Sequence, residues 1–394
     1  MTEGHHDPRP ASPGAQSPPE WRIPWAPATA LFLGSFAWSF VHVTLPFYIT
    51  EMSTFDPATT LQWSGWILGI SSLVTVVTAP FWGRLASRVS PKTLWILTEL
   101  LQGLGFFFMA LAHTLPQLFL ARAVLGVMGA ASTLAFILAG RRGTSVRRDV
   151  SAMQSGLTVG QVLGPLPGAV IAARVGFVPS FVIGGLILWA CAVLVWAAIR
   201  YEPATAPGSR PGRPTSVREV GLAALVVLAG SMQIFFLTAI LPETLPKLGV
   251  AAPDTLEVGG LLIFVSGVAA ALGSLAAPRL AELGGDRRVV PWLLGGSSVC
   301  LAAFALAPDV WSFGALRFVQ VLWVAPVFPL VVAAIAQGAS GQAIGFVNSA
   351  RIAAAFLGPV IATTLLARGS AGLVYLTLAA AGLVLLPVLR RGRR

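Results

Sequence analysis

The stretch LPQLFLARAVLGVMGAASTLAFIL, residues 115–138, decides the fold of this chain. Arg122 is its only charged residue. A helix that crosses a bilayer needs roughly 20 mostly apolar residues, because the hydrocarbon core is about 30 Å thick. In hydrocarbon the backbone must satisfy its own hydrogen bonds, and a helix does this within one segment. The stretch therefore predicts a membrane-spanning helix.

Similar apolar runs recur along the chain, which is 56% hydrophobic and only 10% charged. Soluble domains carry roughly 25% charged residues, so this composition indicates a lipid environment. The predicted spans are 26–49, 60–82, 93–112, 115–138, 151–173, 177–199, 220–242, 258–278, 290–307, 310–335, 343–367 and 370–389. The sequence therefore predicts an all-α membrane protein with twelve transmembrane helices.

The net charge of +11 is distributed in a way that predicts topology. The cations form short clusters between the apolar runs, as in the positive-inside pattern, so we expect no nucleic-acid partner. With the N-terminus in the cytoplasm, twenty of the 26 Lys and Arg residues fall on the cytoplasmic side and three fall opposite. Three remain inside spans: Arg122, Arg317 and Arg351. We predict a multi-pass protein of the cell (inner, cytoplasmic) membrane with both termini cytoplasmic.

A Pro-, Gly- and Arg-rich segment divides the spans into six and six. We expect a disordered cytoplasmic tail over 1–24, a six-helix bundle over 25–200 and a flexible cytoplasmic linker over 201–217. A second six-helix bundle over 218–390 and a basic cytoplasmic tail over 391–394 follow.

The two halves repeat at an offset of about 195 residues. Matching pairs occur in the same order in both halves: Arg84-Leu85-Ala86 with Arg279-Leu280-Ala281, Arg122 with Arg317, Gln154-Ser155-Gly156 with Asn348-Ser349-Ala350, Gly164-Pro165 with Gly358-Pro359, and Leu45-Pro46 with Leu241-Pro242. This repeat predicts two pseudo-symmetric bundles, with a site between them that opens to either side in turn.

The fifth span carries glycines at every fourth position: Gly156, Gly160, Gly164 and Gly168, with Pro165 beside the third. Glycines four residues apart share a helix face and allow another helix to approach closely, although such packing is also common in any membrane bundle. Two further patterns are Arg122 followed by Gly126 in the fourth span, and GRLASRVSPK over 83–92 after the second span.

These three motifs resemble those of the major facilitator superfamily, and more narrowly of its twelve-span drug:proton antiporter branch. The resemblance implies that the glycine motif marks an antiporter, and that Arg122 takes part in proton coupling. It also implies that the loop with Gly83, Arg84 and Arg88 helps to latch the cytoplasmic side closed. Ser87 replaces the acidic residue of that loop, so Asp149 in the next cytoplasmic loop is the candidate partner for its arginines.

By the same resemblance, spans 1, 4, 7 and 10 line a central cavity. The candidate residues for proton coupling or the substrate cavity are His42, Glu99, Arg122, Arg317, Arg351 and Asn348. His42 is favoured over Glu99 as proton carrier, because a histidine with its reference pKa of about 6.5 titrates near neutral pH. Each of these residues also has a structural alternative, as a buried group bonded to neighbouring helices.

We therefore predict a secondary transporter that exports a small amphiphilic compound in exchange for protons. Three arginines in spans favour an anionic or zwitterionic solute, provided that they face the cavity. The alternatives are a proton-coupled importer of a small metabolite and a non-transporting assembly or sensor protein on the same scaffold. We expect no enzymatic activity, no cofactor and no metal, because neither a phosphate-binding loop nor a ligand pattern is present. The expected oligomeric state is a monomer.

Overall fold

The computed structural model describes residues 21, 23–141, 146–200, 216–284, 286–336 and 341–391. The predicted tails and linker lie mostly outside these residues, so their boundaries stay predictions.

The described chain is a bundle of helices, and a single isolated β-bridge, Trp21 with Ile199, is its only strand-like pairing. The helices of the first half are α1 (Ala26–His42), α2 (Leu45–Met52), α3 (Pro57–Ala86), α4 (Pro91–Ala110), α5 (Leu115–Val127), α6 (Ala131–Gly140), α7 (Val146–Leu163), α8 (Pro165–Val175) and α9 (Phe177–Ala198).

The second half follows the same plan. Its helices are α10 (Val217–Phe235), α11 (Leu237–Thr244), α12 (Thr255–Gly284), α13 (Asp286–Ala303), α14 (Val310–Val324), α15 (Val327–Ala336), α16 (Gly341–Arg368), α17 (Ala371–Leu383) and α18 (Leu385–Arg391), with short 3₁₀ helices η1 (Pro246–Leu248), η2 (Ala252–Asp254) and η3 (Phe304–Leu306).

Twelve stretches of the described chain are long and apolar enough to cross a membrane, which confirms the predicted fold class. The predicted single helices were wrong in one respect. Spans 1, 4, 7 and 10 are each broken into two helices, as are spans 5 and 12. Proline accounts for two of the breaks, because Pro46 and Pro165 stand in the first turns of α2 and α8, where no intrahelical N–H is required. Non-helical backbone at membrane depth is tolerated only inside protein or beside water.

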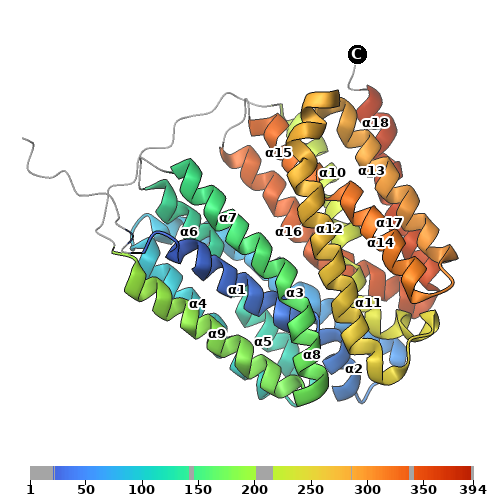
Figure 1. The fold of residues 1–394 in the computed structure, drawn as a ribbon, viewed down its shortest axis with the longest axis horizontal. Coiled ribbons are helices and arrows are strands. Elements are labelled where there is room, and N and C mark those ends of the chain that lie inside the picture. The colour runs from blue at the N-terminus through green and yellow to red at the C-terminus, as the bar shows by residue number, and fades with distance from the viewer. Residues whose placement is uncertain are drawn as a thin grey trace, which may run out of the picture.

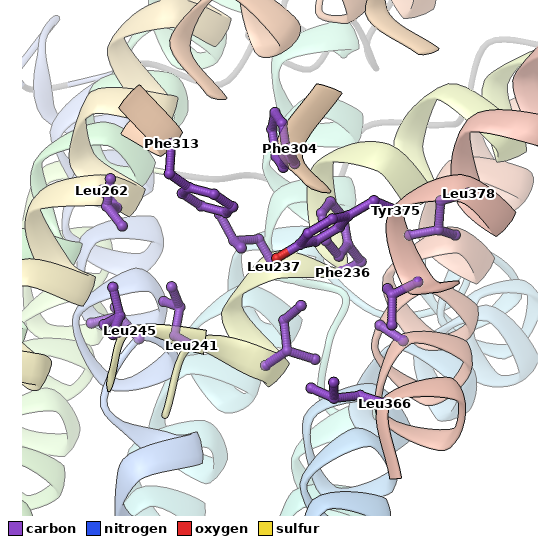
Figure 2. Close-up of a cluster of buried hydrophobic side chains, with 14 of the residues drawn as sticks. Phe236, Leu237, Leu241, Leu245, Leu262, Phe304, Phe313, Leu366, Tyr375 and Leu378 are labelled. Atoms are coloured by element: carbon purple, nitrogen blue, oxygen red, sulfur yellow. The ribbon is translucent and has the colours of Figure 1, made fainter. Parts of the chain in front are cut away.

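The two halves lie side by side, with α1 to α9 on one side and α10 to α18 on the other (Figure 1). A large apolar cluster joins them away from the end at which the C-terminus lies. It combines Val43, Phe47 and Ala169 of the first half with residues of the second, such as Leu241 and Leu366. Figure 2 shows its second-half members gathered around Phe236, Phe313 and Tyr375.

Glycines allow the halves to pack tightly along two helix pairs. A Cβ on Gly65 of α3 would lie 2.1 Å from Thr363 Oγ1 of α16, and one on Gly260 of α12 would lie 2.3 Å from Ala169 Cβ of α8. Toward the opposite end, Figure 1 shows α7 diverging from α12 and α16. There a Cβ on Gly345 would meet no atom within 4 Å. The halves therefore touch at one end and separate at the end that carries the C-terminus.

Candidate functional site

Two buried polar clusters lie inside the spans, one in each half, and they match at the repeat offset of about 195 residues. The corresponding pairs are Arg122 with Arg317, Trp38 with Gln233, Ser71 with Ser266, and Gln102 with Ser297. The repeat had predicted only the arginine pair. Their partners depend on which faces of spans 1, 2 and 3 turn toward span 4, and a single sequence does not specify these rotations.

In the second half, every side-chain nitrogen of Arg317 donates to a protein acceptor. Its Nη1 donates to Gln233 O at 2.8 Å and to Gln320 Oε1 at 2.7 Å, and its Nη2 donates to Ile234 O at 2.7 Å. Its Nε donates to Ser266 Oγ at 3.2 Å. The guanidinium is 2% exposed and joins α10, α12 and α14, which favours the structural alternative for this residue.

The Gln233 side chain extends this cluster outward. Its amide nitrogen donates to Ser298 Oγ at 2.8 Å and its amide oxygen accepts from Ser297 Oγ at 2.9 Å. Because α13 supplies both serines, the buried polar groups join the cavity-side helices α10 and α14 to the outer helix α13.

In the first half, Arg122 keeps an unused donor. Its Nε and Nη2 donate to Ile67 O and Leu68 O of α3 at 3.3 and 3.1 Å, and the guanidinium lies 5.2 Å from the Trp38 ring centroid. Its Nη1 is buried and has no hydrogen-bond partner among the described residues. The same arginine position is therefore bonded at every nitrogen in one half and incompletely paired in the other.

His42 lies one helical turn from Trp38 on α1, and Arg122 is the charged group that acts on it electrostatically. The described part of the chain offers His42 no hydrogen bond, and its side chain is half-buried.

Glu99 of α4 is 2% exposed and belongs to a separate pocket between α1, α4 and α9. Its Oε1 accepts from Trp95 Nε1 at 3.0 Å, whereas its Oε2 is buried without a partner in the described chain. A Cβ on Gly34 of α1 would lie 3.3 Å from Oε1, so the carboxyl touches α1 directly. The described residues contain no ion pair between Glu99 and Arg122.

A bridge of two side chains links the Glu99 helix to Arg122. Gln102, one turn after Glu99 on α4, accepts a hydrogen bond from Trp38 Nε1 and donates to Met128 O at 3.0 Å. Trp38 in turn stacks on Arg122. Gln102, Trp38 and Arg122 are thus in contact inside the first half, one helical turn from Glu99 on α4.

Arg351 and Asn348 lie on α16, toward the end where the halves separate. The guanidinium of Arg351 lies 4.7 Å from the Phe328 ring centroid of α15 and, within the described chain, makes no hydrogen bond. Asn348 is exposed and precedes Arg351 by about one turn. A half-buried, unpaired guanidinium beside an aromatic ring is able to bind an anion with an apolar body.

The glycine motif packs against the backbone of α1 in perfect register. Would-be Cβ atoms on Gly156, Gly160, Gly164 and Gly168 meet the carbonyl oxygens of Ala28, Phe32, Phe36 and Phe40 at 2.2, 2.4, 2.7 and 2.1 Å. Pro165 begins α8 in the middle of this contact. Each glycine is thus required by the approach of span 5 to span 1.

Gly83 and Arg84 lie in the last turn of α3 rather than in a loop, Arg88 follows the end of that helix, and all three are exposed. Two other cations close helix ends there. Arg141 Nη2 donates to Ala86 O at 2.7 Å, and Lys92 Nζ donates to Trp196 O at 3.0 Å and also to Ile199 O. Cations at helix C-termini satisfy free carbonyls and complement the helix dipole.

Asp149 is buried in the first turn of α7. Its pairing with Arg84 or Arg88 stays a prediction.

Comparisons with known proteins agree with this architecture. The family model of the Major Facilitator Superfamily matches residues 27–251. The multidrug resistance protein MdtG of Yersinia enterocolitica is 28% identical over 73% of this chain and 72% of its own length. The uncharacterized MFS-type transporter YuxJ of Bacillus subtilis is 27% identical over 80% of this chain and 83% of its own length. The crystal structure of the nucleoside transporter NupG shares the fold, with a TM-score of 0.72 at 13% identity over 94% of this chain and 99% of that one.

Proposed function

Because this chain belongs to the major facilitator superfamily and is a membrane transporter rather than an enzyme, we propose that it exports small amphiphilic compounds in exchange for protons. The main observation behind this proposal is the close packing of the four span-5 glycines against the backbone of span 1. The motif resembles that of antiporters, and its four glycines all pack on the backbone of α1. The similarity to proteins named MdtG supports efflux as the direction.

The described conformation supports alternating access. The halves touch at the end away from the C-terminus and diverge at the other. With both termini in the cytoplasm, this is an inward-open state that receives solute from the cytoplasm or the inner leaflet. Rocking of the halves about the α3–α16 and α8–α12 contacts would then expose the solute outside.

Glu99 is our candidate proton carrier, with His42 as the second. The carboxyl of Glu99 is buried in a span and one of its oxygens has no hydrogen-bond partner in the described chain, and an ionisable group in such a place favours a functional role. Since Glu99 touches α1 at Gly34, loss of its proton would disturb the packing of a cavity helix. His42 is ranked second, because in the described part of the chain no hydrogen bond ties it to a neighbouring helix, whereas Glu99 accepts from Trp95 and touches α1.

Arg351 is our candidate for substrate recognition. Of the three arginines in spans, Arg317 is occupied by protein acceptors, whereas Arg351 is unpaired in the described chain and stacks on Phe328. This pair suits an amphiphile with a carboxylate or phosphate and an apolar body.

Everted membrane vesicles test the export proposal. Energised by respiration, vesicles that contain the protein should accumulate a fluorescent amphiphilic anion, and its addition should release protons from the acidified interior. Vesicles with Arg351→Gln should accumulate an ammonium-bearing amphiphile as well as the parent does, but the anion several-fold less. Accumulation only in right-side-out vesicles would favour the importer alternative. An absence of flux with every probe would favour the non-transporting alternative.

The proton carrier is tested by Glu99→Gln and His42→Asn in the same vesicles. We expect Glu99→Gln to abolish solute-dependent proton release while downhill solute exchange continues. His42→Asn should retain coupling. The reverse pattern would assign the proton to His42.

A further inference from the structure

A second opening lies outside the central site, on the outer side of the second half. Its volume is about 830 Å³, and α12 and α13 form its walls. Leu322, Trp323 and Pro326, from the junction of α14 and α15, form its floor. The Trp323 ring in this floor packs tightly on α13, since a Cβ on Gly296 would lie 2.2 Å from it.

At the matching place of the first half stands a buried tryptophan. Trp82 of α3 is 4% exposed, donates Nε1 to Val127 O at 2.6 Å and packs in the apolar cluster with Leu94 and Leu134. At the repeat offset of about 195 residues, α12 has Ala277 instead. Gly273 and Ala276 are the small residues of α12 that line the groove and leave it open.

The groove has the depth of one leaflet. From Leu283 at its mouth to Gly273 at its inner end, α12 rises about 15 Å. The hydrocarbon core is about 30 Å thick in total, so the groove spans about half of it. Trp292 on the wall is 70% exposed, as expected for an aromatic side chain at the membrane interface. An acyl chain suits an apolar groove of this depth.

Both signs of charge stand at the mouth. Arg288 is the first residue of its span, and Glu282 precedes the end of α12. No ion pair joins these two side chains in the described part of the chain. A phosphate suits the guanidinium, and a primary ammonium group suits the carboxylate because it donates hydrogen bonds.

We propose that the groove between α12 and α13 binds one phospholipid with a primary-amine headgroup, such as phosphatidylethanolamine. Its acyl chain lies on Trp323 and Pro326, its phosphate at Arg288 and its ammonium at Glu282. The lipid holds α12 and α13 together at the end of the bundle where the transporter halves separate.

Native mass spectrometry of the full-length protein in detergent tests this site. The probes are phosphatidylethanolamine, phosphatidylcholine and phosphatidylglycerol with identical acyl chains. The parent should bind one phosphatidylethanolamine about fivefold or more tightly than either other lipid. Arg288→Gln should weaken all three lipids by about fivefold. Glu282→Gln should remove the preference for phosphatidylethanolamine over phosphatidylcholine.

Ala276→Trp places a bulky ring in the groove lining and should abolish the bound lipid, and Ala276→Met is the milder version if the first fails to fold. Arg279→Gln is the matched control, because Arg279 is an exposed cation of the same region outside the groove lining. Lipid binding that survives both Ala276 substitutions would overturn the site. Equal binding of the three lipids by the parent would overturn the headgroup assignment. The measurement does not depend on transport, so its result is independent of the proposed export.

Discussion

Two arginines at matching positions of the repeat have different surroundings. Arg317 donates to four acceptors, whereas Arg122 uses two carbonyls and an indole ring and keeps Nη1 unpaired. The repeat therefore conserves a charge position and changes what it contacts. In the first half of the described chain, Nη1 of Arg122 is therefore free to donate to a ligand or to a carboxylate that moves toward it. In the second half, Nη1 of Arg317 is already bonded to protein acceptors.

Replacing Arg317 by Met should lower stability more than it changes transport specificity. The substitution removes the donor to three buried acceptors: Gln233 O, Ile234 O and Gln320 Oε1. This should lower the free energy of unfolding by about 3 kcal/mol. Thermal unfolding in detergent should show a clearly lowered midpoint, and the folded fraction should keep the solute preference of the parent. Unchanged stability with altered preference would instead make Arg317 a substrate contact.

Gly160→Ala tests the contact between spans 5 and 1. The new Cβ would lie 2.2 Å from Ser35 Oγ and 2.4 Å from Phe32 O, and the second atom is backbone that cannot move alone. Overpacking of this kind costs about 1–3 kcal/mol and should reduce the transport rate in vesicles. Gly345→Ala is the control, because a Cβ there meets no atom within 4 Å. Equal transport by both variants would contradict a close-packing role for the motif.

At the scale of elements, the twelve spans were predictable because hydrocarbon thickness sets their length, and cations and prolines separate them. The breaks inside spans 4 and 7 were not, because they depend on local packing, as at Gly129, whereas the break in span 1 coincides with Pro46. Arg122, Glu99 and Arg351 were identifiable from the sequence, since a charge in an apolar run requires a reason. Trp38, Gln102 and Gln233 were not singled out as site residues, because their importance arises only from helix rotation.

The first turn of α14 is held by a capping box that makes its stability depend on pH. Backbone hydrogen bonds from Ser312 and Trp311 hold the pKa of the Asp309 carboxyl below its usual value. The charged cap therefore stabilises the fold above the unfolded pKa of about 3.9 and loses this effect as the pH falls through the lowered pKa. Asp309→Ala should lower the unfolding midpoint at neutral pH, and the difference from the parent should shrink on acidification.

Asp56 provides an independent repeat of that measurement at the start of α3. Its carboxyl accepts from Ala58 N and Thr59 N, and its pKa is also lowered, chiefly by hydrogen bonding to Thr59. The difference in unfolding midpoint between the parent and Asp56→Ala should likewise shrink below about pH 4. A constant difference from the parent at every pH would mean that the caps act without their charge.

At the scale of the whole molecule, the contact between halves decides which side is open. Trp66 of α3 lies edge-on to Phe356 of α16, with ring centroids 5.4 Å apart, and Arg174 of α8 pairs with Glu257 of α12 at 3.5 Å. The ion pair is exposed and contributes little by itself. The apolar contact between Trp66 and Phe356 therefore stabilises this closed end more than the ion pair does. When the halves open here, the buried area that is lost must be regained by contacts between the halves at the end near the C-terminus.

A disulfide between α7 and α12 should therefore trap the described state. A Cβ on Gly267 would lie 3.5 Å from Val162 Cβ, which falls within the range of natural disulfides. After Cys191 and Cys300 are replaced by Ser, the double variant Val162→Cys with Gly267→Cys should crosslink under mild oxidation and stop transport, and reduction should restore it. Each single variant should remain active in both conditions. If the crosslinked protein still transports, these halves do not separate along α7 and α12, and alternation must proceed by a movement that leaves this contact closed.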